Sequence, residues 1–119
     1  MKVRFLINKN RYRNAENADD HPLSWPLALF IRTDVQAAPN YCRELIQEVE
    51  NAKRGVGEPF EGVGNSCFLS ISPKGVYIKN EYDESLPAVE LSLDQFKQVI
   101  EAWLKFIEGS GEPVEIEVK

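Results

Sequence analysis

The stretch CFLSISPKGVYIK, residues 67–79, decides the fold class because its apolar residues recur at every second position on both sides of a turn. Cys67, Leu69 and Ile71 alternate with Phe68, Ser70 and Ser72, and beyond the turn Val76 and Ile78 alternate with Tyr77 and Lys79. A period of two is typical of strands that bury one face. The segment Ser72-Pro73-Lys74-Gly75 has proline and glycine where a tight turn accommodates them. The sequence therefore predicts an antiparallel hairpin at the centre of a sheet.

Two segments flanking this hairpin have the 3.6-residue period of an amphipathic helix. The first runs from about Tyr41 to Arg54, with Cys42, Leu45, Ile46 and Val49 on one face and Gly55 as the expected stop. The second follows Ser92 and Gln95, which are spaced as a capping box, and ends at Gly109. Its apolar stripe is predicted to consist of Leu93, Phe96, Ile100, Trp103, Leu104 and Ile107.

The first forty residues have a weaker pattern. Val3, Phe5 and Ile7 alternate with their neighbours and predict a strand, whereas residues 8–22 contain almost no apolar residues and predict a mobile loop. Residues 22–26 are expected to be stiff and extended, because a residue that precedes proline disfavours helical geometry. Residues 27–31 form an apolar run for which we favour a helix or turn over a buried strand.

Further strands are expected over residues 59–63 and 114–118, the second because Val114, Ile116 and Val118 alternate with charged residues, and Val89, Leu91 and Leu93 lead into the second helix. The resulting order of elements predicts the α+β class, with an antiparallel sheet and two main helices packed on one face. We interpret residues 1–119 as a single domain, a common size for one hydrophobic core. If the first and last strands pair, Lys2 and Arg4 would face Glu115 and Glu117.

The net charge of −5 is unevenly distributed along the chain. Residues 1–54 contain nine basic and seven acidic side chains, a balance of +2, whereas residues 55–119 contain five basic and twelve acidic ones, a balance of −7. The acidic half argues against a nucleic-acid ligand, because phosphate contacts need clustered lysine and arginine. It is compatible with a basic protein partner, or with acidic residues that only maintain solubility.

Few residues offer catalytic or cofactor chemistry. Cys42 and Cys67 have apolar neighbours and are expected to be buried free thiols, and with His21 they provide too few ligands for a zinc site. His21 lies next to Asp19 and Asp20, but no nucleophile motif accompanies it, so a general base is disfavoured. Glu81, Asp83 and Glu84 lack the spacing of a calcium loop. The expectation is therefore no catalytic residue, metal or cofactor.

The chain is expected to act in the cytoplasm and to have no membrane contact. Its N-terminal apolar run is too short for a signal peptide, and no stretch approaches the roughly 18 apolar residues that cross a bilayer. Of the two tryptophans, Trp103 is expected in the core, whereas Trp25 fits a core position and an exposed anchor equally well.

Several segments from residue 58 onward together resemble small immunity proteins of bacterial polymorphic-toxin systems, including those of contact-dependent growth inhibition. They are EPFEGVGN (58–65), the alternating strand 66–72, SPKGVYI (72–78), NEYD (80–83), VELSLDQF (89–96) and WLKFI (103–107). Taken together these motifs are moderately specific, and the resemblance covers about half of the chain.

The resemblance implies a cytoplasmic protein without enzymatic activity that neutralises one cognate toxin domain, often a nuclease, by tight stoichiometric binding. Nucleases tend to be basic because their substrates are polyanions, which fits the acidic second half of this chain. The expected contact residues combine carboxylates with an aromatic anchor: Glu61, Glu81, Tyr82, Asp83 and Glu84.

Two other classes of function remain open from the sequence. A generic protein-interaction adaptor or subunit would need an exposed apolar patch instead of an acidic one. A small enzyme would need a cleft in which His21 meets a carboxylate or a thiol from elsewhere in the fold.

Overall fold

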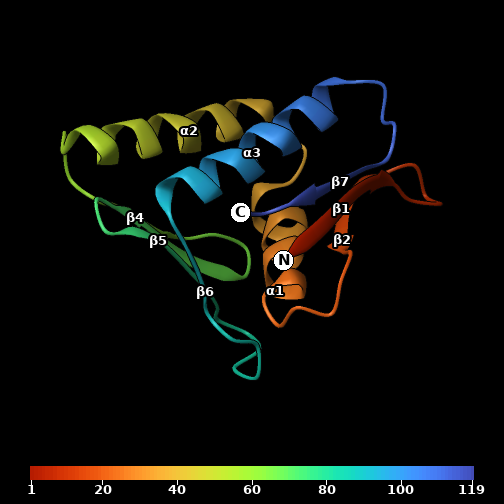
Figure 1. Ribbon diagram of the computed structural model, residues 1–119, viewed down its shortest axis with the longest axis horizontal. Coiled ribbons are helices and arrows are strands. Elements are labelled where there is room, and N and C mark those ends of the chain that lie inside the picture. Colours follow the sequence, from red (N-terminus) through yellow and green to blue (C-terminus); the bar gives the residue numbers. More distant parts are fainter.

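The computed structural model describes all 119 residues, which form seven strands and three helices with a π-helical turn after the first helix (Figure 1). In chain order the elements are β1 (Lys2–Ile7), β2 (Arg13–Asn17), α1 (Ser24–Phe30), the π-turn η1 (Ile31–Val35), α2 (Pro39–Arg54), β3 (Phe60–Val63), β4 (Cys67–Ser72), β5 (Gly75–Asn80), β6 (Val89–Leu91), α3 (Leu93–Glu108) and β7 (Val114–Glu117). The predicted α+β class is confirmed.

The strands form two antiparallel sheets, where the sequence predicted a single one. One sheet has the order β2-β1-β7 and the other the order β3-β4-β5-β6. The predicted hairpin of β4 and β5 lies at the centre of the second sheet. Because β2 and β7 pair with the two edges of β1, these three strands form a separate sheet and do not join the β4–β5 hairpin.

The predicted pairing of the first and last strands is confirmed. Lys2 lies opposite Glu117 and Arg4 opposite Glu115 in the β1–β7 register, while Glu16 of β2 lies on the other side of Arg4. The Arg4 guanidinium donates hydrogen bonds to Glu115 Oε1 at 2.6 Å and to Glu16 Oε1 at 2.9 Å. These bonds raise the pKa of Arg4. On this face of the three-stranded sheet, the positive charge of Arg4 therefore offsets the negative charges of Glu16 and Glu115.

The helices connect the two sheets. In Figure 1, α2 and α3 lie side by side above the sheets, and α3 packs against β5 and β6 of one sheet and β7 of the other. The shorter α1 packs against β1, β2 and β5 and so lies between the sheets. The predicted capping box of α3 is present: Gln95 N donates to Ser92 Oγ at 3.0 Å and Ser92 N donates to Gln95 Oε1 at 2.8 Å. Gly55 ends α2 with φ of 66°, a left-handed conformation that favours glycine.

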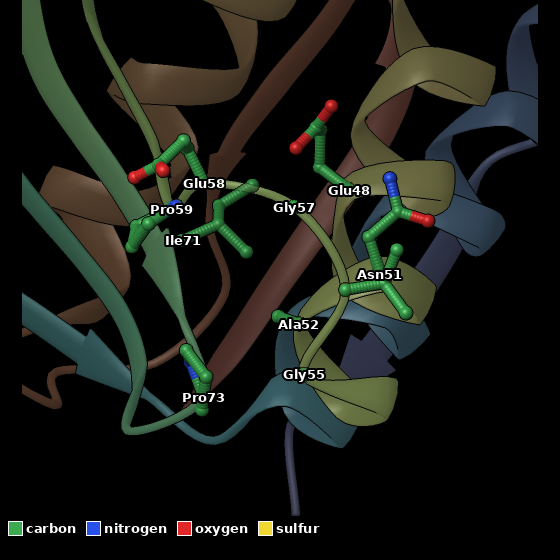
Figure 2. A pocket seen from close by; sticks show the side chains of 10 residues that line it. Glu48, Asn51, Ala52, Gly55, Gly57, Glu58, Pro59, Ile71 and Pro73 are labelled. Carbon is green, nitrogen blue, oxygen red and sulfur yellow. The ribbon is translucent and has the colours of Figure 1, made fainter.

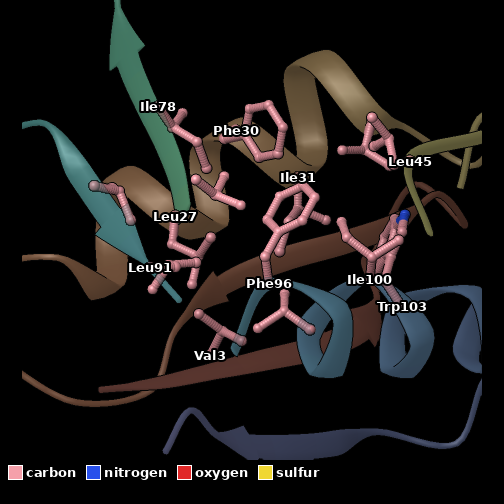
Figure 3. Close-up of a cluster of buried hydrophobic side chains, with 14 of the residues drawn as sticks. Val3, Leu27, Phe30, Ile31, Leu45, Ile78, Leu91, Phe96, Ile100 and Trp103 are labelled. Carbon is pink, nitrogen blue, oxygen red and sulfur yellow. The ribbon is translucent and has the colours of Figure 1, made fainter. Parts of the chain in front are cut away.

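A single core of 24 buried hydrophobic residues joins these layers (Figure 3). In it, Phe96 of α3 points toward Phe30 of α1, with ring centroids 6.3 Å apart. Trp103 is fully buried, as expected, and its ring meets Phe5 of β1 edge-on at 5.0 Å. The face of α3 that enters the core includes Val99 and Phe106, whereas the predicted stripe residues Leu93, Leu104 and Ile107 are only partly buried.

The N-terminal region departs most from the prediction. Residues 8–22 were expected to form a loop, yet β2 lies within them, because a single small side chain, Ala15, enters the core. Residues 22–26 were expected to be extended, yet α1 begins at Ser24. Pro26 is tolerated there because the first turn of a helix has no intrahelical acceptor for its N–H groups. The expected helix or turn over residues 27–31 is confirmed by α1.

Trp25, which fitted a core and an exposed position equally well, is exposed. Its side chain is 36% exposed, and the guanidinium carbon of Arg32 lies 5.7 Å from the ring centroid. The arrangement is a cation–π contact between α1 and η1 that covers part of the ring.

Charge reversal of β7 tests the pairing of the terminal strands. The double variant Glu115→Lys with Glu117→Lys places like charges opposite Arg4 and Lys2, which destabilises an antiparallel ladder. We expect its melting temperature to fall by a few degrees. The control is Glu44→Lys with Glu112→Lys, which makes the same change of net charge at two exposed residues without ion pairs. Equal melting temperatures for the two double variants would contradict the pairing.

Candidate partner-binding surface

Four of the five expected contact residues lie in one loop, residues 81–88, which joins β5 to β6. Asn80, the last residue of β5, is buried, and its Oδ1 accepts hydrogen bonds from Tyr82 N at 2.9 Å and Asp83 N at 2.8 Å. Glu81 N donates to Ser66 O at 2.7 Å. A buried amide and the neighbouring β3–β4 turn therefore fix the first half of the loop.

The second half of the loop is held from within and from the sheet. Asp83 Oδ1 accepts hydrogen bonds from Ser85 N at 3.0 Å and Ser85 Oγ at 2.5 Å. Lys79 of β5 donates from Nζ to Leu86 O at 2.6 Å. Because Lys79 lies on the solvent side of the sheet, opposite Phe68, this bond places the loop next to that face.

The side chains of this loop extend into water. Glu81, Asp83 and Glu84 are exposed, and Tyr82 is 82% exposed. The loop projects away from the layer formed by α2 and α3 (Figure 1). An ordered backbone thus presents three carboxylates and one phenol ring where a large partner can reach them.

Glu61, the fifth expected residue, lies elsewhere on the same sheet. It is an exposed residue of β3 and faces Ser70 of β4, which in turn faces Tyr77 of β5. No hydrogen bond or ion pair joins Glu61 to the loop. The structure therefore brings Glu81, Tyr82, Asp83 and Glu84 together and places Glu61 on the solvent face of the sheet.

None of these four carboxylates takes part in an ion pair. All six ion pairs lie on the three-stranded sheet, at the N-terminus or on the helices: Met1–Asp19, Arg4–Glu16, Arg4–Glu115, Arg43–Glu108, Lys53–Asp94 and Lys97–Glu50. The negative charge of the loop and of Glu61 is consequently uncompensated by the chain itself.

Asp34 of η1 positions this region, a role that no pattern in the sequence predicted. Its carboxylate accepts hydrogen bonds from Cys67 N at 2.9 Å, from Ser66 Oγ at 2.9 Å and from Thr33 Oγ1 at 2.7 Å. The same Ser66 accepts the backbone bond from Glu81. A Cβ atom on Gly64 would lie 2.5 Å from Asp34 Oδ2, so glycine lets the turn approach the carboxylate. The separation of 32 residues between Asp34 and Ser66 hides this contact from any local pattern.

His21 and the two cysteines lie in different environments and do not meet. His21 is exposed, and its Nδ1 accepts a hydrogen bond from Leu23 N at 3.1 Å. Cys42 and Cys67 are buried free thiols, as expected. Burial raises the pKa of Cys42 to about 11 and that of Cys67 to about 12. The thiols therefore stay protonated and unreactive at neutral pH.

A small cavity of about 150 Å³ lies between the C-terminal end of α2 and the segment that leads to β3 (Figure 2). Glu48 and Asn51 line it from α2, Glu58 and Pro59 line it from the opposite side, and Ile71 lies between them. The lining includes no serine, cysteine or histidine. Two carboxylates next to the negative end of a helix offer an environment that suits a cation more than an anion.

Neither metal-site geometry nor a membrane-spanning helix is found. No three or more histidine, cysteine, aspartate or glutamate side chains gather closely enough to hold a metal ion. None of the three helices has the length and apolar character that a bilayer crossing requires.

Removal of the Asp34 carboxylate is expected to loosen the β3–β4 turn. In Asp34→Ala the N–H of Cys67 loses its acceptor and the hydroxyl of Ser66 loses one of its two, which costs about 1–3 kcal/mol of folding stability. The measurements are chemical denaturation and amide hydrogen exchange, in which Glu81 N–H should exchange faster than in the wild type. Asp20→Ala, which removes an exposed carboxylate far from this turn, is the control and should leave this exchange nearly unchanged. Equal protection of Glu81 in Asp34→Ala and the wild type would contradict the positioning role.

Thiol reactivity tests the burial of the cysteines. Because thiolate is the reactive form and both pKa values are raised, a thiol-specific reagent at pH 8 should modify neither Cys42 nor Cys67 in the folded protein. Both should react within minutes in denaturant, where the thiols regain ordinary pKa values. Rapid modification of either residue without denaturant would show that its side chain is accessible in the native state.

Comparison of the chain with protein-family models, with curated proteins and with solved structures finds no match in any of the three. The resemblance of residues 58–107 to immunity proteins therefore gains no support from these comparisons. The surface defined by Glu61 and the β5–β6 loop is the feature from which a function can be argued.

Proposed function

We propose that this chain is an immunity protein, which binds and neutralises a cognate toxin domain, of the basic nuclease class, by stoichiometric protein–protein contact. The surface that makes this contact consists of Glu61, Glu81, Tyr82, Asp83 and Glu84. The observation that carries the proposal is the β5–β6 loop, whose three carboxylates have no ion-pair partner although hydrogen bonds hold its backbone.

Long-range electrostatics favour this kind of partner. The chain has a net charge of −5, and its second half, which contains the whole surface, has a balance of −7. Nuclease domains tend to be basic because they bind polyanions, and a basic domain and this acidic chain attract each other before they touch. Such attraction raises the association rate, which an inhibitor needs if it is to act before the toxin finds its substrate.

The ordered loop favours tight binding. Association of two proteins loses affinity when flexible segments must first be ordered, at about 0.5–1.5 kcal/mol for each immobilised flexible side chain. Here Asn80, Asp83 and Lys79 already hold the backbone before any partner arrives. Tyr82 offers a large ring with only two side-chain torsions, a residue type enriched at the centres of protein interfaces.

A second candidate function is an adaptor that recognises a partner without inhibiting a toxin. The observation in its favour is the exposure of apolar side chains on the four-stranded sheet, where Val63 is 66% and Tyr77 38% exposed. An enzymatic function gains less support, because His21 is exposed whereas both thiols are buried.

The test uses the C-terminal domain of the protein encoded directly beside this chain as the toxin candidate. We expect that domain to arrest growth, co-expression of this chain to restore growth, and the two proteins to purify as a 1:1 complex. In the double variant Glu81→Lys with Glu84→Lys, the loss of attraction should raise Kd by at least about tenfold. The control, Glu44→Lys with Glu112→Lys, makes the same charge change elsewhere and should have a much smaller effect.

Two results would reject parts of this proposal. A neighbouring protein that is not toxic, or that this chain neither binds nor neutralises, would favour the adaptor function instead. Equal affinities for the loop variant and the control variant would remove the β5–β6 loop from the contact surface.

A further inference from the structure

The two sheets differ in how their solvent faces are charged. On the three-stranded sheet Arg4 lies between Glu16 and Glu115 and binds both, so opposite charges compensate each other. On the four-stranded sheet the helices cover only one face, which buries the alternating residues Leu69, Ile71, Val76 and Ile78. The opposite face of this sheet has no covering element and no ion pair.

A row of cross-strand neighbours spans this open face. Glu61 of β3 faces Ser70 of β4, Ser70 faces Tyr77 of β5, and Tyr77 faces Glu90 of β6. Both glutamates are exposed, one on each outer strand. Because neighbouring strands are about 4.8 Å apart, the backbone positions of the two glutamates lie roughly 14 Å from each other. They mark two positions for positive charge, one on each outer strand.

The centre of the same face is aromatic. Phe68 of β4 and Tyr77 of β5 meet at 6.2 Å between ring centroids, with an interplanar angle of 62°. Tyr77 is 38% exposed, and Val63, which faces Phe68, is 66% exposed. A shallow hollow of about 420 Å³ lies beside the ring and is lined by Ser70, Ser72, Tyr77 and Glu90 among others. An apolar centre with a polar rim is the usual anatomy of a protein-binding site.

The charged residues of this face are mostly acidic, although Lys74 of the β4–β5 turn lines the hollow as well. Glu61, Glu90 and the loop residues Glu81, Asp83 and Glu84 have no ion-pair partner. Lys79 is the only cation among the strand residues of the face, and its Nζ is already bonded to Leu86 O. Polyanions and anionic lipid surfaces are repelled by such a surface, whereas a basic protein surface is attracted to it.

We infer that this open face, centred on Tyr77 and Phe68 and flanked by Glu61 and Glu90, is the main docking surface, and that its occupant is a basic protein surface presenting arginine side chains. Arginine fits best because its planar guanidinium stacks on aromatic rings and also forms paired hydrogen bonds with a carboxylate. This inference rests on the proposed function and deepens it: the acidic loop becomes the rim of the site and the sheet its centre.

The division into centre and rim predicts different kinetics for the two groups of residues. Exposed rim charges act at a distance and change the association rate, whereas contacts in the desolvated centre determine the dissociation rate. Variants of the sheet face should therefore raise koff, and variants of the loop should lower kon.

The first experiment needs no toxin. The isotopically labelled full chain is titrated with a hexa-arginine amide peptide at low ionic strength while its backbone amide NMR signals are recorded. We expect the largest shifts at Glu61, Phe68, Tyr77 and Glu90. Glu61→Gln with Glu90→Gln should abolish these shifts, whereas the control pair Glu101→Gln with Glu117→Gln should keep them. Shifts confined to the loop, or shared equally with the three-stranded sheet, would overturn the inference.

The second experiment measures binding kinetics with the toxin candidate described above. Tyr77→Ala is expected to raise koff by about tenfold or more with little change in kon. Tyr12→Ala, which removes a 69% exposed ring near the β1–β2 turn, is the matched control and should leave koff unchanged. A melting temperature measured for each variant separates lost contacts from lost folding. An unchanged koff in a folded Tyr77→Ala protein would overturn the inference and leave the immunity function intact.

Failure of the immunity function gives a different pattern. If the candidate domain does not bind the wild-type chain, the kinetic arm yields no complex, and the peptide titration alone decides whether the face selects arginine. Shifts on the sheet face would then support the docking surface with a basic partner other than a toxin.

Discussion

Trp103 is the residue on which the arrangement of the molecule depends most. Its ring is fully buried where α3 meets β1, with Phe5 at 5.0 Å and Phe106 at 5.6 Å between centroids. Its indole Nε1 donates a 2.7 Å hydrogen bond to Gln36 O, directly after the π-turn η1. Gln36 has φ of 58° and ψ of −171°, a conformation that disfavours any residue except glycine, so neighbouring contacts must hold it. One side chain thus fixes a helix, a strand and an irregular turn together.

A chain of contacts leads from Trp103 to the candidate surface. Asp34 precedes Gln36 by two residues and accepts hydrogen bonds from Ser66 and Cys67 at the start of β4. Ser66 O then accepts the backbone bond from Glu81, the first residue of the acidic loop. Apart from the short stretch of backbone between Asp34 and Gln36, each step is a hydrogen bond between segments distant in sequence. The loop is therefore positioned by the packed core, although its own side chains are in water, and this explains how a charged surface segment keeps a defined shape.

The sequence predicted those elements for which the local residue pattern is compatible with only one secondary structure. The β4–β5 hairpin, α2 and α3 combine period, turn residues and caps that agree with each other. It failed at β2, where only Ala15 is buried, and at the first residues of α1, where Pro26 suggested an extended segment. The number of sheets was also beyond reach, since pairing partners depend on contacts between distant strands. A local pattern states that a segment is a strand and not which strand it joins.

Only the part of the candidate surface that is continuous in sequence could be predicted. Residues 81–84 lie together because they are adjacent in sequence, which requires no knowledge of the fold. The row that contains Glu61, Tyr77 and Glu90 exists only through the registers of three strand pairs.

Charge compensation needs the three-dimensional arrangement as well. Arg4 compensates Glu115 across 111 residues, whereas Glu90 finds no cation. A solvated carboxylate without a partner has little effect on folding, because exposed ion pairs contribute at most about 1 kcal/mol. Stability therefore gives little reason to pair the charges of the open face, and they remain available to a partner.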